Sequence, residues 1–173
     1  MTATIATKKT LTREQLRALL THPAGCIASG FGSGLSPIAP GTAGSLIALI
    51  PWWFVLRGLP IAWYVLVLIV AFVIGVWACD LAGRRLGVDD HRALVWDEFV
   101  GQWIALLAAP RGWPWMVAGF ALFRLFDIWK PWLIRVADRR VHGGFGVMLD
   151  DVLAGIYALI VMQIAAAILR YVR

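Results

Sequence analysis

The stretch IAWYVLVLIVAFVIGVWAC, residues 61–79, decides the class of this protein. Every residue in it is apolar, aromatic or small, and an α-helix of this length rises about 28 Å, close to the hydrocarbon thickness of a bilayer. We therefore predict a membrane-spanning helix here. A second run, Val152–Leu169, is nearly as long and precedes Arg170 and Arg173, whose side chains can reach the interface. We predict a second span there.

The composition of the whole chain agrees with a membrane protein. Its 173 residues are 61% hydrophobic, with a mean hydropathy of +0.78, whereas soluble domains are roughly 45–50% apolar. Ten tryptophans suit an interfacial aromatic belt. The net charge of +6 does not indicate a nucleic-acid partner, because the basic residues are scattered among hydrophobic runs. Two cysteines, Cys26 and Cys79, indicate neither a disulfide framework nor a zinc site.

Three shorter apolar runs complete the expected bundle. Residues 42–56 include Pro51, and residues 99–109 and 115–123 are joined by a Pro-Arg-Gly turn at 110–112. Each is short for a bilayer, so kinked, tilted and re-entrant helices all remain open. The fold class that we predict is all-α, an integral membrane bundle of about four to five membrane helices, some of them short or re-entrant.

The N-terminal region is expected to lie outside this bundle. Residues 1–11 are predicted to be disordered, without the apolar core of a signal peptide. Thr12 and Gln15 form a capping box that opens a surface helix over residues 13–20, ending before Pro23. We divide the chain into residues 1–29, a tail with an amphipathic interfacial helix, and residues 30–173, the membrane-embedded domain.

The distribution of charge predicts an orientation. If the N-terminus is cytoplasmic and all five runs cross, most basic residues lie inside, as the positive-inside rule requires. The basic residues left outside are Arg57, Arg111, Arg170 and Arg173. The same topology places every acidic residue on the cytoplasmic side, so one face holds the candidate chemistry.

The segment FRLFDIWKPWLIRVADRRVHGGFGVMLDD, residues 123–151, brings both signs of charge close to the bilayer and is expected to be an active-site loop. Carboxylates stand at three helix ends: Asp97-Glu98, Asp127 and Asp150-Asp151. Hard oxygen ligands from several elements are what Mg²⁺ requires. The alternative is that these acids complement helix dipoles, with Asp150 as an N-cap.

Two cations flank Asp127. Arg124 and Lys130 could neutralise a metal-bound phosphate, although an Arg124–Asp127 structural pair or interfacial snorkelling would explain them equally. Lys130 precedes Pro131, which should fix the end of the helix there.

Glycine-rich segments at 30–44 and 143–146 could let backbone N–H groups approach an anion, with Thr42 and Ser45 adding hydroxyl groups. Residues 25–45 hold six glycines and two prolines, which argues against a regular element. No Walker A, dinucleotide or GxSxG motif is present, so glycines that serve turns or close packing remain the alternative. The histidines lack a nucleophile at a recognisable spacing, which leaves metal-activated water or an aspartyl nucleophile.

Four blocks, taken in order, carry a resemblance to a known family. They are FGSGLSPIAPGTAGS at 31–45, DHRALVWDEFVGQW at 90–103, FRLFDIWKPW at 123–132 and GGFGVMLDDVLAGIY at 143–157. With these blocks the chain resembles the phosphatidylglycerophosphatase A family of bacterial membrane phosphatases. The one departure is Leu133, where proline is expected, and it affects the local turn only.

The resemblance implies an all-helical enzyme of the bacterial inner membrane, with its active site facing the cytoplasm. Such an enzyme removes the terminal phosphate of phosphatidylglycerophosphate with Mg²⁺ and leaves phosphatidylglycerol. The matching acidic positions are Asp97, Glu98, Asp127, Asp150 and Asp151. The matching basic positions are Arg124 and Lys130, and the matching loop positions include Gly32, Gly34, Thr42 and Ser45.

Our hypothesis from the sequence is that Mg²⁺ is held by a subset of Glu98, Asp127, Asp150 and Asp151, with Asp97 as ligand or base. Arg124, Lys130, Gly32, Gly34, Thr42 and Ser45 would bind the substrate phosphate. Two alternatives remain: a phosphatase of another lipid phosphate such as phosphatidic acid, and a membrane transporter or scaffold that uses its acids for ion passage or helix register. The sequence indicates no oligomeric state.

Overall fold

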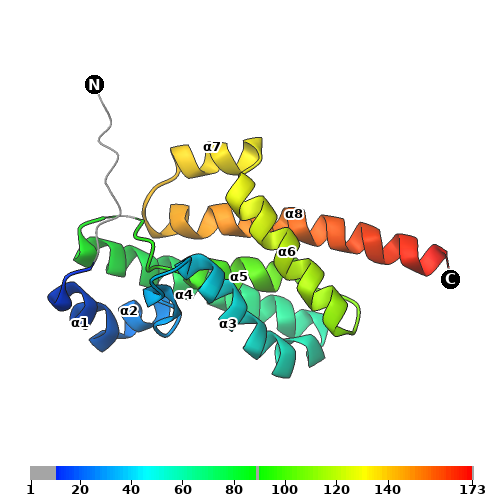
Figure 1. Ribbon diagram of the computed structural model, residues 1–173, viewed down its shortest axis with the longest axis horizontal. Helices are drawn as coiled ribbons and strands as arrows, with labels where there is room; N and C mark the ends of the chain where they lie inside the picture. Colours follow the sequence, from blue (N-terminus) through cyan, green and yellow to red (C-terminus); the bar gives the residue numbers. More distant parts are fainter. Residues whose placement is uncertain (1–10, 89, 173) are drawn as a thin grey trace.

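The computed structural model describes residues 11–88 and 90–172, and Figure 1 shows them as an all-α bundle. The α-helices of this described part are α1 (Arg13–Thr21), α2 (Pro23–Ala28), α3 (Pro40–Phe54), α4 (Ile61–Leu86), α5 (Trp96–Ala105), α6 (Trp113–Trp129), α7 (Trp132–Arg140) and α8 (Gly143–Tyr171). Two short 3₁₀ helices, η1 (Ser33–Leu35) and η2 (Leu56–Gly58), flank α3. The all-α prediction is confirmed. The disorder expected for residues 1–11 falls almost entirely outside the described residues.

The helices α4 and α8 are long and apolar enough to cross a membrane. They contain the two runs predicted to span, and both are longer than expected: α4 has 26 residues and α8 has 29. Large apolar side chains such as Val73 and Ile164 are more than half exposed on them. Apolar groups turned outward in this way suit contact with lipid rather than a soluble core.

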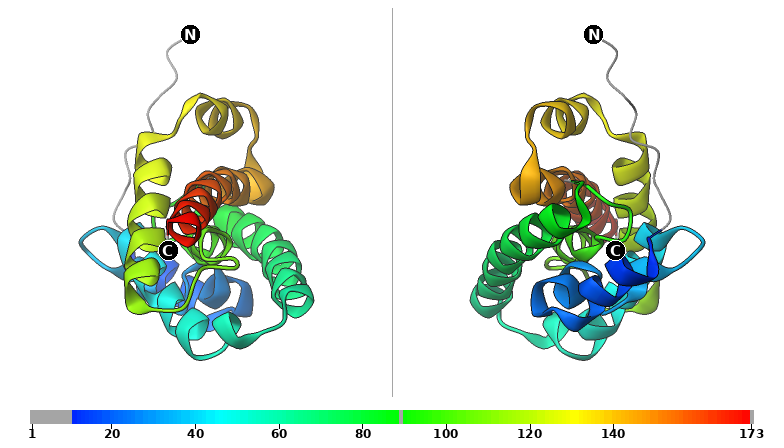
Figure 2. Two further views of the ribbon diagram at one scale, coloured as in Figure 1. Left: turned by 90° about the vertical axis from the view of Figure 1, so that its right-hand side faces the viewer. Right: turned by 90° about the vertical axis from the view of Figure 1, so that its left-hand side faces the viewer.

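The short helix α5 lies at the centre of the bundle. It packs against α3, α4, α6 and especially α8, and Figure 2 shows α4 and α6 on opposite sides of α8. A Cβ on Gly101 of α5 would lie 2.7 Å from the carbonyl oxygen of Asp151, and one on Gly155 of α8 would lie 2.5 Å from the carbonyl oxygen of Gly101. The two backbones therefore touch, as small residues allow in membrane helices.

The N-terminal capping box is confirmed. The Thr12 hydroxyl accepts from the Gln15 amide N–H at 3.2 Å, and the Gln15 side chain accepts from the Thr12 N–H at 3.0 Å. The helix ends at Thr21, before Pro23, as predicted.

The prediction that residues 25–45 form no regular element is wrong. Helix α2 begins at Pro23 and α3 begins at Pro40, because proline suits the first helical position. Gly25 is helical and lies against the backbone of Leu19, where a Cβ would collide. Irregular chain is confined to the stretch between α2 and α3, where Gly32 has a φ of 92°.

The expectation of a loop at residues 123–151 is also wrong. The segment contains the end of α6, all of α7 and the first turns of α8. Residues 143–146 belong to α8, where Gly144 packs against the backbone of α4. Asp150 is not an N-cap, because His142 occupies that position and Asp150 lies two turns further along α8. The end of α6 before Pro131 is confirmed, with Lys130 as a left-handed C-cap at a φ of 45°.

Replacing Gly101 with valine should destabilise the bundle by about 2 kcal/mol or more, because the side chain would meet Phe123 and the Asp151 carbonyl and force α5 away from α8. Unfolding of the purified protein in detergent, followed by circular dichroism, measures this. Gly58→Ala is the matched control, since a Cβ at Gly58 meets nothing within 4 Å. Equal stability of the two variants would refute the close α5–α8 contact.

Candidate active site

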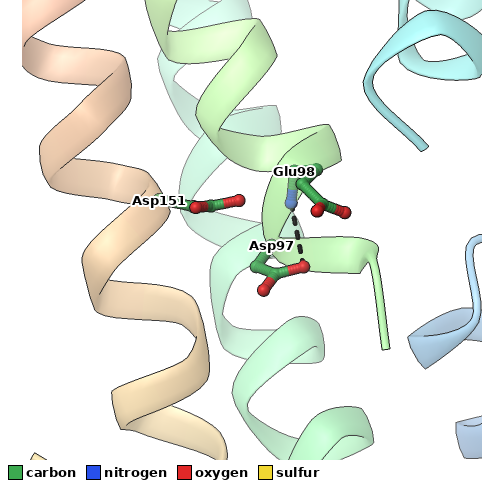
Figure 3. A group of neighbouring side chains, drawn as sticks. All are labelled: Asp97, Glu98 and Asp151. Atoms are coloured by element: carbon green, nitrogen blue, oxygen red, sulfur yellow. Dashed lines mark hydrogen bonds between the residues drawn. The ribbon is translucent and has the colours of Figure 1, made fainter. Parts of the chain in front are cut away.

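Three carboxylates meet where α5 and α8 touch. Asp97 and Glu98 stand in the first turn of α5, and Asp151 reaches toward them from α8 (Figure 3). One oxygen from each lies within 4.8 Å of the other two. Asp151 is only 3% exposed, and its Oδ2, like Oε2 of Glu98, is buried without a hydrogen-bond partner in the described structure. Buried carboxylate oxygens that lack a donor suit a cation, so this group could hold a metal ion.

The pKa values of Asp97 and Glu98 on α5 also favour a cation at this position. Burial raises the pKa of Asp97 well above its usual range, and the neighbouring carboxylates of Glu98 and Asp150 raise it further. Burial also raises the pKa of Glu98 to about 8, although Arg124 opposes the shift. Without a cation these groups therefore favour the protonated state, and a bound metal ion would compensate the buried negative charge.

Arg124 of α6 lies beside this group and links α6 to α5 and α3 through its contacts. Its Nη1 lies 2.8 Å from Oδ2 of Asp127 and 3.6 Å from Oε1 of Glu98, and it donates to the Ser45 hydroxyl of α3 at 3.3 Å. The pair with Asp127 is the one that their i, i+3 spacing predicted. The Nε of Arg124 is buried without a partner among the described residues, so the guanidinium keeps a donor for a ligand.

Lys130 is the C-cap of α6, and its side chain connects α7 with α8. Its Nζ donates to Oδ1 of Asp138 at 2.8 Å and to Oδ2 of Asp150 at 2.7 Å. Burial alone would lower the pKa of Lys130, but the two carboxylates outweigh it and raise that pKa. The ammonium group is therefore charged, and it fixes α7 against α8.

A small cavity of about 100 Å³ opens beside the three carboxylates. It is lined by Asp90, Asp97, Asp138, Val141, His142, Gly143, Gly146, Val147 and Asp150. Because Asp97 lines the cavity and also belongs to the carboxylate group, a ligand in the cavity would lie next to a cation held there. The space suits a group of phosphate size better than a whole lipid.

Of the phosphate-binding residues predicted in the glycine-rich block, Ser45 adjoins the carboxylate group through Arg124. Gly41 and Gly44 of α3 approach the Glu98 carboxylate, and a Cβ on Gly44 would lie 3.1 Å from its Oε2. Gly34 packs instead against the Ala93 backbone, and Gly32 forms a left-handed turn. Thr42 stands in the first turn of α3 and is partly exposed.

The structure thus brings together most of the predicted side chains. Asp97, Glu98 and Asp151 form one group, and Ser45, Arg124 and Asp127 adjoin it. Asp150 borders the cavity, and Lys130 is paired with Asp150. Three residues that line the cavity, Asp90, Asp138 and His142, had no assigned role in the site from the sequence. The contact between Asp138 and Lys130 depends on α7 folding back over α8, and no pattern in the sequence predicts this packing.

The chain is similar to a family of known proteins over most of its length. Residues 26–166 match the family model described as Phosphatidylglycerophosphatase A. The chain is 51% identical over 141 residues to "Phosphatidylglycerophosphatase A" of Escherichia coli (strain K12), and the match covers 81% of each chain. It is 46% identical over 144 residues to the protein of the same name from Haemophilus influenzae, and this match covers 83% of this chain and 88% of the other. It is 47% identical over 146 residues, or 80% of this chain and 91% of the other, to a Bacteroides thetaiotaomicron protein named "Putative phosphatidylinositol-3-phosphatase". No solved structure matches the chain.

Metal binding at the carboxylate group should weaken as the pH falls. Glu98 has a raised pKa of about 8, and a metal ion binds the deprotonated carboxylate, so below that pH protons compete with the ion. We expect Mn²⁺ affinity, measured by electron paramagnetic resonance of the purified protein, to fall up to about tenfold per pH unit below pH ~8. Glu98→Gln should flatten this dependence, whereas Glu14→Gln on α1 should not. An affinity independent of pH in this range would contradict the assignment.

Proposed function

This chain belongs to the phosphatidylglycerophosphatase A family, and we propose that it carries out the reaction that the family name describes. In that reaction water hydrolyses the terminal phosphomonoester of phosphatidylglycerophosphate, giving phosphatidylglycerol and inorganic phosphate. The observation that carries the proposal is the group formed by Asp97, Glu98 and Asp151 inside the region that matches the family, in which one oxygen of Glu98 and one of Asp151 are buried without a partner.

We infer that the metal ion is Mg²⁺, held by Asp97, Glu98 and Asp151. Three carboxylate oxygens from two helices give the hard donor set that Mg²⁺ prefers, and the remaining coordination positions suit waters or phosphate oxygens. When bound, Mg²⁺ supplies positive charge against the phosphate oxygens and makes a coordinated water more acidic. Asp127 and Asp150, also expected as ligands from the sequence, are each paired with a cation, and we assign them the role of holding Arg124 and Lys130.

The cations of the chain bind and orient the phosphate in this scheme. Arg124 has an unpaired Nε, and its Nη1 lies 3.6 Å from Glu98. Lys130 is paired with Asp138 and Asp150, which line the cavity. Positive charge fixed at this position stabilises the negative charge that spreads over the phosphoryl oxygens in the transition state. Because both cations are held by carboxylates before substrate arrives, little reorganisation is needed.

Asp97, which the sequence offered as ligand or base, is assigned here as a ligand. Its Oδ1 accepts from the Glu98 N–H at 3.0 Å, which leaves Oδ2 for the cation. The attacking water loses a proton as its oxygen bonds to phosphorus. The bond from phosphorus to the glycerol oxygen breaks in the same step, and that oxygen takes up a proton to become the new hydroxyl group.

We place the enzyme in the bacterial inner membrane with α4 and α8 as spans, the shorter α3, α5 and α6 packed among them, and the site at the cytoplasmic interface. The two candidate spans and the predominance of basic residues at the same end as the carboxylates support this orientation. The substrate's acyl chains would stay in the lipid phase while its terminal phosphate reaches the cavity.

The substrate could also be a different lipid phosphomonoester. The name of the Bacteroides relative favours a phosphoinositide, and phosphatidic acid carries the same terminal group. Because the chain belongs to a family named as a phosphatase, we favour an enzyme over the transporter or scaffold considered from the sequence. We retain phosphatidylglycerophosphate as the substrate because the family model and two of the relatives carry that name.

Replacing Asp151 with asparagine should lower phosphate release from phosphatidylglycerophosphate by about 100-fold or more, because one ligand charge is lost from the metal group. The assay is phosphate release in mixed micelles with Mg²⁺, and chelation of the metal should have a comparable effect on the wild type. Glu14→Gln is the control, since Glu14 is exposed on α1 and belongs neither to the carboxylate group nor to the cavity lining. Near-wild-type activity of folded Asp151→Asn would sink the assignment.

Substrate choice is tested separately. We expect kcat/KM for phosphatidylglycerophosphate to exceed the values for phosphatidic acid and phosphatidylinositol 3-phosphate by about tenfold or more in the same micelles. A higher value for either rival would transfer the proposed function to that lipid while leaving the site assignment intact.

A further inference from the structure

A second, larger cavity lies at the other end of the bundle from the carboxylates. It has a volume of about 420 Å³ and opens between the α5–α6 connection and the last turns of α8, at the right-hand end of α8 in Figure 1. Its lining residues are Ala108, Pro110, Arg111, Trp115, Ala166, Leu169 and Arg170. None of the roles assigned to the active site involves this end of the molecule.

The lining of this cavity is cationic. Arg111 and Arg170 both border it, and no carboxylate does. Neither arginine forms an ion pair within the described residues, and Arg170 uses only its Nε, which donates to the Ala166 carbonyl one turn earlier in α8 at 3.2 Å. The terminal guanidinium nitrogens of both residues are therefore available to an anion, and Trp115 and Leu169 supply apolar walls.

The position of the cavity along α8 sets its depth in a bilayer. Leu169 follows Asp151 by 18 positions (169 − 151) in one continuous helix, which is a rise of about 27 Å and close to the hydrocarbon thickness. With the carboxylates at one interface, the cavity lies at the other. The positive-inside rule disfavours arginine at that interface, so two arginines sharing one cavity there call for a ligand.

We propose that this cavity binds the headgroup phosphate of an anionic phospholipid in the leaflet opposite the active site. Arg111 and Arg170 donate to the phosphate oxygens, and the acyl chains lie along α8. A lipid rather than free phosphate is the occupant because the adjoining surface is apolar: Ile168 and Leu169 are 57% and 53% exposed. The inference rests on α8 spanning the membrane and does not depend on the proposed reaction.

A neighbouring arginine supplies a matched control. Arg57 lines a separate cavity of about 250 Å³ at the same end of the molecule, and the two cavities share Ala108. The Arg57 guanidinium lies over the Trp53 ring, 3.7 Å from its centroid, so one of its faces is already covered. Arg57→Gln removes a charge at the same interface without changing the proposed site.

The test measures lipid binding to the purified chain in a neutral detergent by native mass spectrometry, with dioleoylphosphatidylserine and dioleoylphosphatidylcholine as competing probes and no added divalent cation. We expect the wild type to retain the anionic lipid preferentially. The double variant R111Q/R170Q should lower that preference about tenfold, because two charge-assisted contacts are lost. R57Q should behave as the wild type does, and R111K/R170K, which keeps the charges, should retain part of the preference.

Three results would overturn the proposal: an unchanged lipid preference in R111Q/R170Q, an equal loss in R57Q, or displacement of the bound lipid by millimolar inorganic phosphate. The last would make the site one for free phosphate. Phosphate release by R111Q/R170Q within about twofold of the wild type verifies that the variant is folded, since Arg170 lies about 28 Å from Asp151 along α8 and Arg111 lines the same cavity as Arg170. Should R111Q/R170Q fail to fold, the single variants R111Q and R170Q, each expected to lose part of the preference, decide the question.

Discussion

The contact between the backbones of α5 and α8 is the constraint on which the site depends. Gly101 and Gly155 let the two helices approach until a carbonyl group of each lies within van der Waals reach of the other helix. Because the helices are this close, the short side chains of Asp97 on α5 and Asp151 on α8 can share one cation. A side chain at either glycine would separate Asp97 from Asp151, so packing and chemistry are set by the same few atoms.

The site concentrates negative charge that the surrounding helices must balance. Arg124 and Lys130 neutralise part of it, and each is tied to a carboxylate outside the central group, Asp127 for the first and Asp150 for the second. The oxygens left over, on Glu98 and Asp151, are buried and lack donors. Desolvation of unpaired charge is costly, so we expect these carboxylates to take up protons when no cation balances them.

The sequence predicts those parts of the fold that depend on local signals. The two long apolar runs, the capping box of Thr12 and the helix end before Pro131 follow from hydropathy, side-chain hydrogen bonding and proline geometry, and the structure contains all three. The helices at residues 23–28 and 143–146 were missed because their glycines serve interhelical packing, which a local pattern cannot distinguish from a turn. The Asp138–Lys130 contact was missed for a related reason, since it exists only once α7 folds back.

Adjacent carboxylates divide their roles because successive side chains on a helix point about 100° apart. On α8, Asp151 turns toward α5 and joins the metal group, while Asp150 turns toward Lys130 and the cavity. On α5, Asp97 lines the cavity, and Glu98 turns toward Gly41 of α3 and Arg124 of α6. The two acids of α8 therefore differ in their partners, the carboxylate group for Asp151 and Lys130 for Asp150. Both acids of α5 belong to the carboxylate group and differ in their second neighbour, which is the cavity for Asp97 and Arg124 for Glu98. Paired acids on one helix turn thus link the carboxylate group to two different surroundings without duplicating one another.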